Sequence, residues 1–356
     1  MWAGSIARDA LRRVLVVQHY GVGDMILTTP LLALLKEQLP DAEVDVLASP
    51  RNATIVADHP AVTRIYTHDH TWRGWLRVLP RLRARRYDAI FTGQAGKGLR
   101  EGLTASLIAH SGTHKVSVWR AKRYQGLFTI VTRAPRRATH TADQVLHLGL
   151  HALGVNAPAS SVAGRRYGLR MAEDSGAAER VDAFLAERRL ESFIVVNLSA
   201  HFAERDWASE HCARCVCELL DRHPDLSVVL TPAPGKARVT ADVARRCASP
   251  RVTLAPVFPL LELASLVRRA AAVISTNTAL VHLASACRRA VVALYAPKVP
   301  SDVSLWLPIG VPYRALASPL RGRVSDIPPQ SIVDAFDELR RETAGRGEPI
   351  ERQLVP

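Results

Sequence analysis

Short apolar segments alternate with longer amphipathic segments along most of this 356-residue chain. Such alternation is typical of parallel βαβ units, because parallel strands need a long crossover connection that is usually a helix. In the first half we expect helices that begin near Asn52, Trp72 and Leu99, and one helix over residues 25–39. The expected strands of this half are residues 13–18, 43–48, 62–66, 87–92 and 115–118.

The alternation starts again after residues 154–168, a segment rich in Gly, Ala, Ser and Pro that has no periodicity. A chain of this length exceeds what one hydrophobic core usually supports. The sequence therefore predicts an α/β protein with two Rossmann-like domains, residues 1–168 and 169–342, whose parallel sheets face each other across a cleft. A mobile tail is expected over residues 343–356. The strands expected in the second half are residues 193–198, 226–231, 272–275 and 290–295 with one near Val252, and its helices include residues 209–222, 260–269 and 329–341.

The chain is strongly basic, with a formal net charge of +14 at pH 7. This charge favours an anionic partner such as nucleic acid, a phosphorylated substrate or an acidic membrane surface. No apolar run approaches the roughly 20 residues that span a bilayer. The N-terminal segment also lacks the pattern of a secretory signal peptide. We therefore expect a cytoplasmic protein.

Arginines recur along the helix expected to begin at Trp72, which also carries Trp75 and Leu76. Basic residues beside exposed tryptophans suit contact with anionic lipid head groups, where aromatic rings lie at the interface. A helix face that is merely solvated is equally compatible with the pattern. The arginines of this segment are Arg73, Arg77, Arg81, Arg83, Arg85 and Arg86.

All five cysteines lie in the second half, and three of them fall in HCARCVCELLDRH, residues 211–223. The close spacing of His and Cys suggests a metal site, but no second ligand pair follows at the spacing of a zinc site. The cluster also falls in an expected helix, and small apolar cysteines pack well in cores. We therefore predict core cysteines and no metal site.

A glycine-containing turn follows the first expected strand. Gly21 and Gly23 allow a tight turn and the close approach of a ligand, and Asp24 falls near the start of the following helix. Open α/β sheets bind ligands at this carboxyl edge of their strands. The dinucleotide-binding fingerprint is weak, because Ile26 replaces its third glycine and Asp45 lies inside the second strand. Asp24 is either a helix N-cap or a carboxylate that takes a proton from a hydroxyl nucleophile.

Polar groups also follow the expected strand over residues 193–198. Asn197 and Ser199 are followed by Arg205, and this set suits a diphosphate because a guanidinium group offers a fork of donors. Alternatively, Arg205 pairs at the surface with its neighbours Glu204 or Asp206.

Residues 273–297, VISTNTALVHLASACRRAVVALYAP, predict a strand, a polar turn, a helix and a second strand. The free N–H groups of the helix's first turn and its positive dipole end would face Asn277 and Thr278, which indicates a phosphate site. His282 lies four residues after Thr278 and therefore on the same helix face. It either bonds to the phosphate or fills the junction between strand and helix.

Three segments, in this order, resemble the bacterial ADP-heptose:lipopolysaccharide heptosyltransferases, glycosyltransferase family nine. The first is residues 22–30, VGDMILTTP. The second combines residues 197–200, NLSA, with Arg205 and Trp207, and the third is residues 277–284, NTALVHLA. The resemblance covers most of the chain.

The resemblance implies a GT-B fold and an inverting, metal-independent glycosyltransferase. Such an enzyme would move a heptose, or a related sugar, to a hydroxyl of a lipopolysaccharide core or another anionic lipid-linked saccharide. Asp24 would be the general base, and Gly21 and Gly23 would belong to the acceptor-side loop. The residues that would bind the donor and its diphosphate are Ser199, Arg205, Asn277, Thr278, Ala279 and His282.

The same resemblance implies a nucleotide-sugar co-substrate, ADP-heptose, and no cofactor. It also implies peripheral contact with the inner face of the cytoplasmic membrane, where a lipid-linked acceptor would be presented. No partnership with nucleic acid is expected on this interpretation.

The chain departs from the family pattern on the donor side. Asn277 stands where the family usually has aspartate, Ala279 stands where a glycine often follows the threonine, and the loop after Thr231 has no acidic residue. An amide hydrogen-bonds a sugar hydroxyl but carries no charge. These differences leave open another sugar-nucleotide donor and a non-catalytic sugar-nucleotide-binding homologue. The net charge leaves open a nucleic-acid-binding protein, although the sequence contains no recognition motif of that class.

Overall fold

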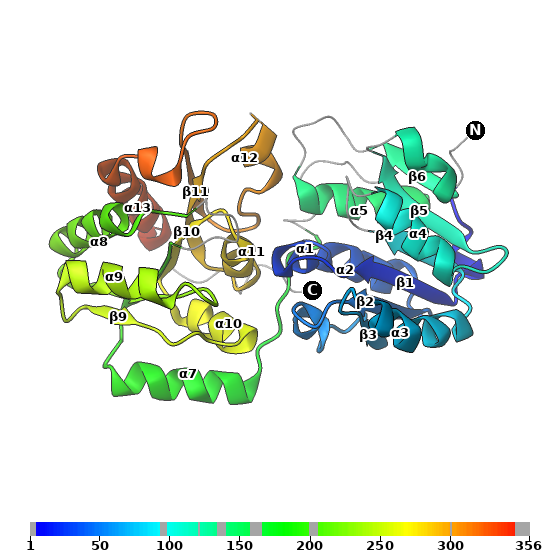
Figure 1. Cartoon of the computed structure of the whole chain (residues 1–356), viewed down its shortest axis with the longest axis horizontal. Helices are drawn as coiled ribbons and strands as arrows, with labels where there is room; N and C mark the ends of the chain where they lie inside the picture. Colours follow the sequence, from blue (N-terminus) through cyan, green and yellow to red (C-terminus); the bar gives the residue numbers. More distant parts are fainter. Residues whose placement is uncertain are drawn as a thin grey trace. The chain divides into compact units, whose positions relative to one another are not determined.

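The computed structural model describes residues 5–92, 98–119, 122–133, 140–156, 166–198, 206–299 and 301–345. The chain divides into two compact units, Met1–Ala172 and Glu173–Pro356, and each is described by itself. Each unit contains a six-stranded sheet in which every strand pair is parallel (Figure 1). The predicted α/β class with two parallel sheets is confirmed.

The sheet of the first unit has the strand order β3-β2-β1-β4-β5-β6. Its strands are β1 (Arg13–Gln18), β2 (Glu43–Ala48), β3 (Arg64–Thr67), β4 (Ala89–Thr92), β5 (His114–Trp119) and β6 (Ile130–Arg133). Its α-helices are α1 (Val22–Ile26), α2 (Thr29–Gln38), α3 (Trp72–Ala84), α4 (Gly98–Ile108) and α5 (Thr141–Ala152), with 3-10 helices η1 (Arg8–Ala10), η2 (Ala53–Val56) and η3 (Lys122–Leu127).

Helices cover both faces of this first sheet. Helices α3 and α4 pack on one face, in a core that joins Val78 and Ile108 to the strand residues Leu15, Leu47 and Ile90. Helix α2 packs against α5. Because the β1–β2 and β3–β4 connections run in opposite directions along the sheet, right-handed crossovers place α2 and α3 on opposite faces. Coverage on both faces explains why β1 is a continuous apolar run rather than an alternating one.

The second unit repeats this topology with the order β12-β11-β10-β7-β8-β9. Counted from its own first strand, β7, the order is that of the first unit and of the dinucleotide-binding fold. Its strands are β7 (Phe193–Asn197), β8 (Ser227–Leu230), β9 (Val252–Leu254), β10 (Ala272–Thr276), β11 (Ala290–Tyr295) and β12 (Tyr313–Ala317). Its α-helices are α7 (Ser175–Glu187), α8 (Ser209–Arg222), α9 (Ala237–Cys247), α10 (Leu260–Arg269), α11 (Ala279–Ala286), α12 (Ser301–Leu305) and α13 (Pro329–Gly345), with the 3-10 helix η5 (Val324–Asp326).

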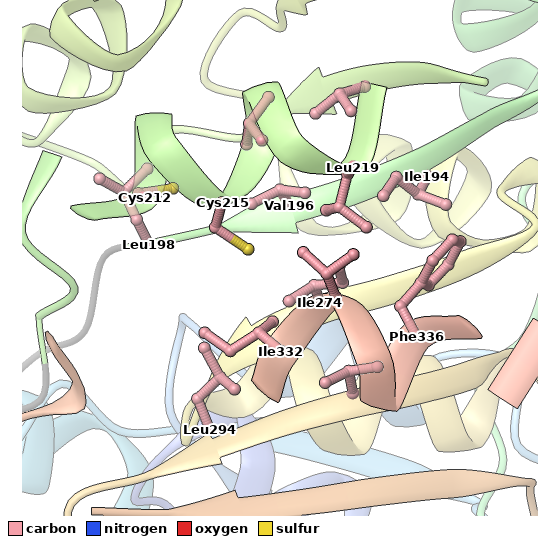
Figure 2. Packing of buried hydrophobic residues seen from close by; sticks show 14 of the residues in the cluster. Ile194, Val196, Leu198, Cys212, Cys215, Leu219, Ile274, Leu294, Ile332 and Phe336 are labelled. Carbon is pink, nitrogen blue, oxygen red and sulfur yellow. The ribbon is translucent and has the colours of Figure 1, made fainter. Parts of the chain in front are cut away.

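The main core of the second unit lies between its sheet and helices α8 and α13. Figure 2 shows Cys215 and Leu219 of α8 close to Ile332 and Phe336 of α13, and all four side chains are buried. Cys212 is fully buried in the same core, and burial raises the pKa of its thiol well above the usual value. The predicted core role is confirmed for Cys212 and Cys215. Among the described residues, no group of three or more His, Cys, Asp or Glu side chains could hold a metal ion.

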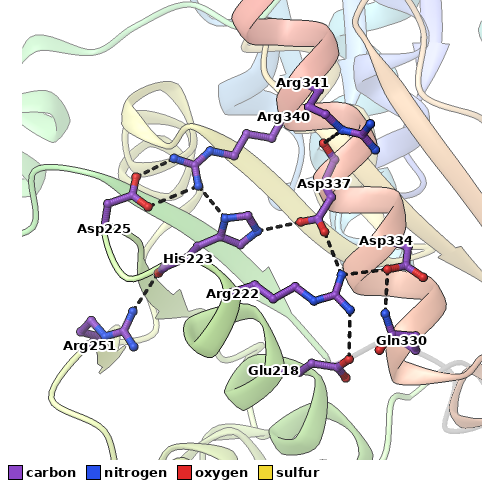
Figure 3. Close-up of polar contacts among 10 residues, drawn as sticks. All are labelled: Glu218, Arg222, His223, Asp225, Arg251, Gln330, Asp334, Asp337, Arg340 and Arg341. Carbon is purple, nitrogen blue, oxygen red and sulfur yellow. Dashed lines mark hydrogen bonds and ion pairs between the residues drawn. The ribbon is translucent and has the colours of Figure 1, made fainter.

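A network of charged side chains joins α8 to α13 beside this core (Figure 3). Arg222 lies 2.8 Å from both Asp334 and Asp337. Nε2 of His223 lies 2.7 Å from Asp337, and Arg340 donates to Nδ1 of the same ring at 2.7 Å. Because Nδ1 accepts this hydrogen bond, the neutral ring carries its hydrogen on Nε2, facing the carboxylate. The network is largely solvated, so it orients the two helices while the core beneath supplies most of the stabilisation.

The single helix predicted over residues 25–39 is wrong, because two helices, α1 and α2, occupy this segment. A continuous helix would need an N–H of Pro30 to bond to the carbonyl of Ile26, and proline has none. The hydroxyl of Thr29 donates to that carbonyl instead, at 2.7 Å. Pro30 instead lies in the first turn of α2, where proline is tolerated, and this position signals the start of a second helix.

Other differences concern edge strands and segment ends. Strands β6 and β12, which were not predicted, are edge strands with short apolar runs. The helix predicted near Asn52 is the 3-10 helix η2. Residues 343–345 belong to α13 rather than to the expected tail, and residues 346–356 lie outside the described residues.

Asp45 is a structural carboxylate of the first unit. It lies in β2 with no exposed surface, and its Oδ2 accepts hydrogen bonds from Arg85 Nε at 3.1 Å and the Tyr87 hydroxyl at 2.8 Å. Burial alone would lower the pKa of Arg85, but its hydrogen bonds to Glu43 and Asp45 outweigh burial and raise that pKa. These partners explain why an acid lies inside a strand rather than at its ligand-binding end.

A buried histidine should make the first unit sensitive to acid. His59 is 6% exposed, and burial together with the positive charge of Arg170 lowers its pKa to about 4. In the unfolded chain a histidine titrates near about pH 6.5. Only the unfolded state therefore binds this proton between about pH 6.5 and 4, and stability is lost as the pH falls through that window, by about 1.4 kcal/mol per pH unit.

The His59→Asn variant tests this linkage by urea unfolding at pH 7 and pH 5. Asparagine retains an acceptor for the N–H of Ala61, which donates to Nδ1 of His59 at 3.2 Å. We expect the wild type to lose about 2 kcal/mol more than the variant between the two pH values. An identical pH dependence in both proteins would show that His59 titrates normally.

Candidate functional site

The candidate residues lie at corresponding places in the two sheets. In each sheet the first three strands extend to one side of the first strand and the next three extend to the other side. The order therefore switches between β1 and β4 in the first sheet and between β7 and β10 in the second. Ligands of open α/β sheets bind outside the carboxyl ends of the strands at this switch point. Gly21, Gly23 and Asp24 follow β1 at the switch point of the first unit. Residues 277–279 follow β10 at that of the second.

Asp24 is the third residue of α1, and Gly21 is the N-cap. Oδ2 of Asp24 reaches back to accept the N–H of Gly21 at 3.1 Å. A Cβ on residue 21 would lie 2.7 Å from that oxygen, which explains the glycine there. Gly23, the second residue of α1, is half-buried like Asp24. The prediction that Asp24 is the N-cap residue is therefore wrong, because Gly21 occupies that position. The Asp24 carboxylate nevertheless helps to cap the helix from the third helical position.

Only one carboxylate oxygen of Asp24 is used in this way. No described residue donates a hydrogen bond to Oδ1. The carboxylate is thus oriented by one oxygen and has the other available for a proton, and it lies on the ligand-binding edge of the sheet. This geometry suits a general base.

Asn52 fixes the loop that carries these residues, and the sequence analysis missed this role. Its side chain has no exposed surface, and Nδ2 lies 3.1 Å from the carbonyl oxygen of Gln18 and 3.3 Å from those of Tyr20 and Gly21. Its Oδ1 accepts the N–H of Ser49 at 2.8 Å. The signal that could have found it is an asparagine just beyond the strand beside β1, where a short amide can bond to neighbouring loops.

Replacing Asn52 with alanine should destabilise the first unit by about 1–3 kcal/mol, because buried backbone groups lose their partner. Thermal unfolding measures the effect. Asn52→Asp tests the donor role of the side chain more specifically. It keeps an acceptor for the N–H of Ser49 but places a carboxylate beside three carbonyl oxygens. It should be at least as destabilising as alanine. Unchanged stability in either variant would contradict the assigned role.

Aromatic side chains surround the same loop. The His19 ring lies 4.9 Å from that of His70 and 4.7 Å from that of Tyr20, between ring centroids. Nε2 of His70 lies 2.9 Å from the carbonyl oxygen of His19, which ties the segment before α3 to the end of β1. Burial, followed by the negative charge of Glu101, raises the pKa of Tyr20 to about 12. The phenol is therefore protonated at neutral pH and is no base for this site.

In the second unit, polar side chains from β7 and β10 join at the switch point. Nδ2 of Asn197 lies 3.1 Å from Oγ of Ser275 and 3.4 Å from Oγ1 of Thr278. Thr278 is the N-cap of α11, where its Oγ1 accepts the N–H of Leu280 at 3.2 Å. The predicted helix start at Thr278 is confirmed. The network holds the first turn of α11 at the strand ends, where free N–H groups attract anions.

The neighbouring candidates differ in accessibility. Asn277 and Ala279 are half-buried on either side of Thr278, and the N–H of Asn277 donates to the carbonyl of Leu294 at 2.9 Å. His282 is only 3% exposed, and its ring centroid lies 6.0 Å from that of Trp306. This position fits the interpretation that His282 fills the strand–helix junction. Its proposed contact with a phosphate stays a prediction.

The loop after β7 lies partly outside the described residues. Ser199 and Arg205 are both in that part, so their predicted diphosphate contacts stay predictions. Asp206, which follows, pairs with Lys236 at 2.6 Å. Trp207 is a core residue that donates from Nε1 to Nδ1 of His211 at 2.7 Å. Lys236 thus brings a cation near the β7–α8 loop, which the sequence analysis overlooked.

The sequence model of the family described as Glycosyltransferase family 9 (heptosyltransferase) matches residues 75–325. This span is more than half of the 356 residues and contains both polar segments of the second unit. The chain belongs to this family. Residues 22–30, which carry Asp24, precede the matched span.

Known relatives of family 9 agree with this assignment. Lipopolysaccharide heptosyltransferase 3 of Escherichia coli K12 is 32% identical over 75 residues, a match that spans 19% of this chain and 22% of that relative's length. A family 9 glycosyl transferase from Veillonella parvula is similar in structure, with a TM-score of 0.78 and 19% identity over 93% of this chain and 97% of that one. The E. coli ADP-heptose LPS heptosyltransferase II has a TM-score of 0.74 and 19% identity, over 93% and 99% of the two chains. The fold of this chain is therefore the GT-B-like fold of heptosyltransferases.

Proposed function

We propose that the chain is an inverting, metal-independent glycosyltransferase. It moves a heptose, or a related sugar, from a nucleotide-sugar donor to a hydroxyl of an anionic lipid-linked saccharide such as a lipopolysaccharide core. The observation that carries this proposal is the polar network of Asn197, Ser275 and Thr278 at the switch point of a family 9 chain. Asp24 complements it as a carboxylate that is oriented through Oδ2 and receives no hydrogen bond at Oδ1 from any described residue.

In this mechanism Asp24 accepts the proton of the acceptor hydroxyl while that oxygen attacks the anomeric carbon of the donor. The bond from this carbon to the diphosphate oxygen breaks, and the anomeric configuration inverts. The negative charge that develops on the diphosphate is stabilised by the N–H groups at the start of α11 and by Arg205. Thr278 and Asn277 orient the donor through hydrogen bonds.

ADP-heptose is the proposed donor because it appears in the name of a structural neighbour of this chain. The neutral amide of Asn277 can bond to a sugar or ribose hydroxyl as donor or acceptor. The acceptor is proposed to be anionic because the chain has a net charge of +14. A lipid-linked acceptor also requires peripheral contact with the inner face of the cytoplasmic membrane.

The decisive experiment incubates the purified chain with ADP-heptose and isolated core saccharides, with other sugar nucleotides in parallel. NMR of the product should give an anomeric configuration opposite to that of the donor. Calorimetry with ADP, UDP and GDP should identify one preferred nucleotide. Nucleotide binding without any transfer would favour a non-catalytic sugar-nucleotide-binding protein, and the absence of nucleotide binding would refute the donor site.

A further inference from the structure

The first unit carries a set of exposed apolar side chains on two of its helices, α3 and α4. We call this set the α3–α4 face. Its members are Trp72 (67% exposed), Leu76 (66%), Leu99 (44%), Leu103 (49%) and Leu107 (49%). The two helices lie side by side, because Nη1 of Arg83 donates to the carbonyl of Leu107 at 2.6 Å.

Helix α4 is apolar on both of its sides. Ala105 and Ile108 face the core of the unit, whereas Leu99, Leu103 and Leu107 follow each other at four-residue spacing on the outside. The outer face of a surface helix is normally charged or polar. The only acidic residue of α4 is Glu101, which is 1% exposed. The exposed leucines therefore indicate a surface that a binding partner covers when the protein functions.

Arginines border these apolar side chains. Arg73, Arg77 and Arg81 follow each other at four-residue spacing on the exposed surface of α3, each one position after a residue of the row Trp72, Leu76 and Pro80. None of the three makes an ion pair with a described residue. The Arg73 guanidinium lies 5.3 Å from the centre of the Trp72 ring. Helix α3 contains no acidic residue.

We propose that the α3–α4 face is a docking surface for an anionic lipid bilayer. Leucine and tryptophan side chains enter the boundary between head groups and acyl chains, while the arginines contact anionic head groups. A second copy of the chain fits less well, because pairing this face with itself would oppose two rows of arginines. Nucleic acid would match the positive charge of the arginines, but its phosphate backbone offers no apolar surface for the exposed leucines. Among the described residues, no helix is long and apolar enough to span a bilayer.

Docking by this face has a consequence for the candidate site of the same unit. His70, two residues before α3, lies 2.9 Å from the carbonyl oxygen of His19 in the loop that leads to Asp24. The exposed Trp72 is therefore close to that loop. A bilayer on the α3–α4 face would bring the loop to the level of the head groups, where a lipid-linked saccharide presents its hydroxyls. This consequence rests on the proposed function, whereas membrane binding itself does not.

Flotation of the full chain with vesicles tests the proposal. We expect binding to vesicles of phosphatidylethanolamine and phosphatidylglycerol, and little binding to vesicles of phosphatidylcholine alone. Leu103→Glu should weaken binding by at least about tenfold, because a charge replaces an exposed leucine that would enter the bilayer. The matched control is Leu320→Glu, which changes a 57% exposed leucine of the second unit and should bind like the wild type. The triple change Arg73→Gln, Arg77→Gln and Arg81→Gln should weaken binding by about 10²-fold at low salt.

Folding and nucleotide binding serve as separate readouts. The thermal unfolding and ADP calorimetry of Leu103→Glu should match those of the wild type, so failure of the donor site and failure of docking remain distinguishable. The proposal is overturned if the wild type does not float with anionic vesicles, or if Leu103→Glu and Leu320→Glu bind equally. It is also overturned if Leu103→Glu abolishes a wild-type dimer in sedimentation, because the face would then bind a second copy.

Discussion

Replacing Asp24 with asparagine is expected to lower the turnover number for sugar transfer by about 10²–10⁴-fold, the usual contribution of a general base. Asparagine keeps an oxygen that can accept the N–H of Gly21, so the start of α1 is preserved while the proton acceptor is lost. The Michaelis constant for the donor should change little, because the donor is proposed to bind the second unit. Steady-state kinetics with the preferred sugar nucleotide measure both quantities.

Asp326 offers a matched control for this experiment. It is the third residue of the 3-10 helix η5, and its Oδ2 accepts the N–H of Arg323 at 2.7 Å, the same capping arrangement as that of Asp24. Asp326→Asn should leave turnover unchanged. Equal turnover in the Asp24 and Asp326 variants would reduce Asp24 to a helix cap and remove it as the base. Asp24→Ala should lower turnover too, and should also lose about 1 kcal/mol of stability with the cap.

Most strands of the two sheets could be predicted from the sequence because their signals are local. The second-unit strand β11 and helices α8 and α10 occupy the predicted ranges, since each is bounded by a cap, a turn or a polar break. Thr278 could be predicted as a helix start because a hydroxyl before an apolar helix has a direct capping role. Such features depend on a few neighbouring residues and on helix or strand periodicity.

Features that depend on distant residues could not be predicted in the same way. Asn52, which fixes the loop before Asp24, is 34 residues from Gln18 and 31 residues from Gly21 along the sequence, so its partners come together only in the folded unit. The four-residue spacing of the leucines in α4 does not show which side of the helix is buried, and only the packing of Ala105 and Ile108 identifies the outer side. The sequence places Asp45 inside a strand rather than at the end where a ligand-binding acid would lie. Only its contacts with Arg85 and Tyr87 show that its role is structural.

Removing Arg85 should give a large loss of stability, about 3–5 kcal/mol for the first unit. Asp45 has no exposed surface, and Arg85 is its charged partner at 3.1 Å. In Arg85→Ala the carboxylate would remain buried with only the Tyr87 hydroxyl to stabilise it. Hydrogen exchange of the β1, β2 and β4 amides, read by mass spectrometry, reports the free energy of unfolding of this unit separately from that of the second.

Two further variants test whether the buried charge of Asp45 causes the loss of stability in Arg85→Ala. Arg166→Ala removes an arginine of the same unit that pairs with Glu37 at 2.5 Å but is 66% exposed, and it should cost less than about 1 kcal/mol. The double change Arg85→Leu and Asp45→Leu removes both charges, so it should recover much of the stability lost in Arg85→Ala. If the double variant is as unstable as Arg85→Ala, the arginine contributes through the packing of its side chain rather than by compensating the carboxylate. In that case the interpretation of Asp45 as a charge retained by its partner would be wrong.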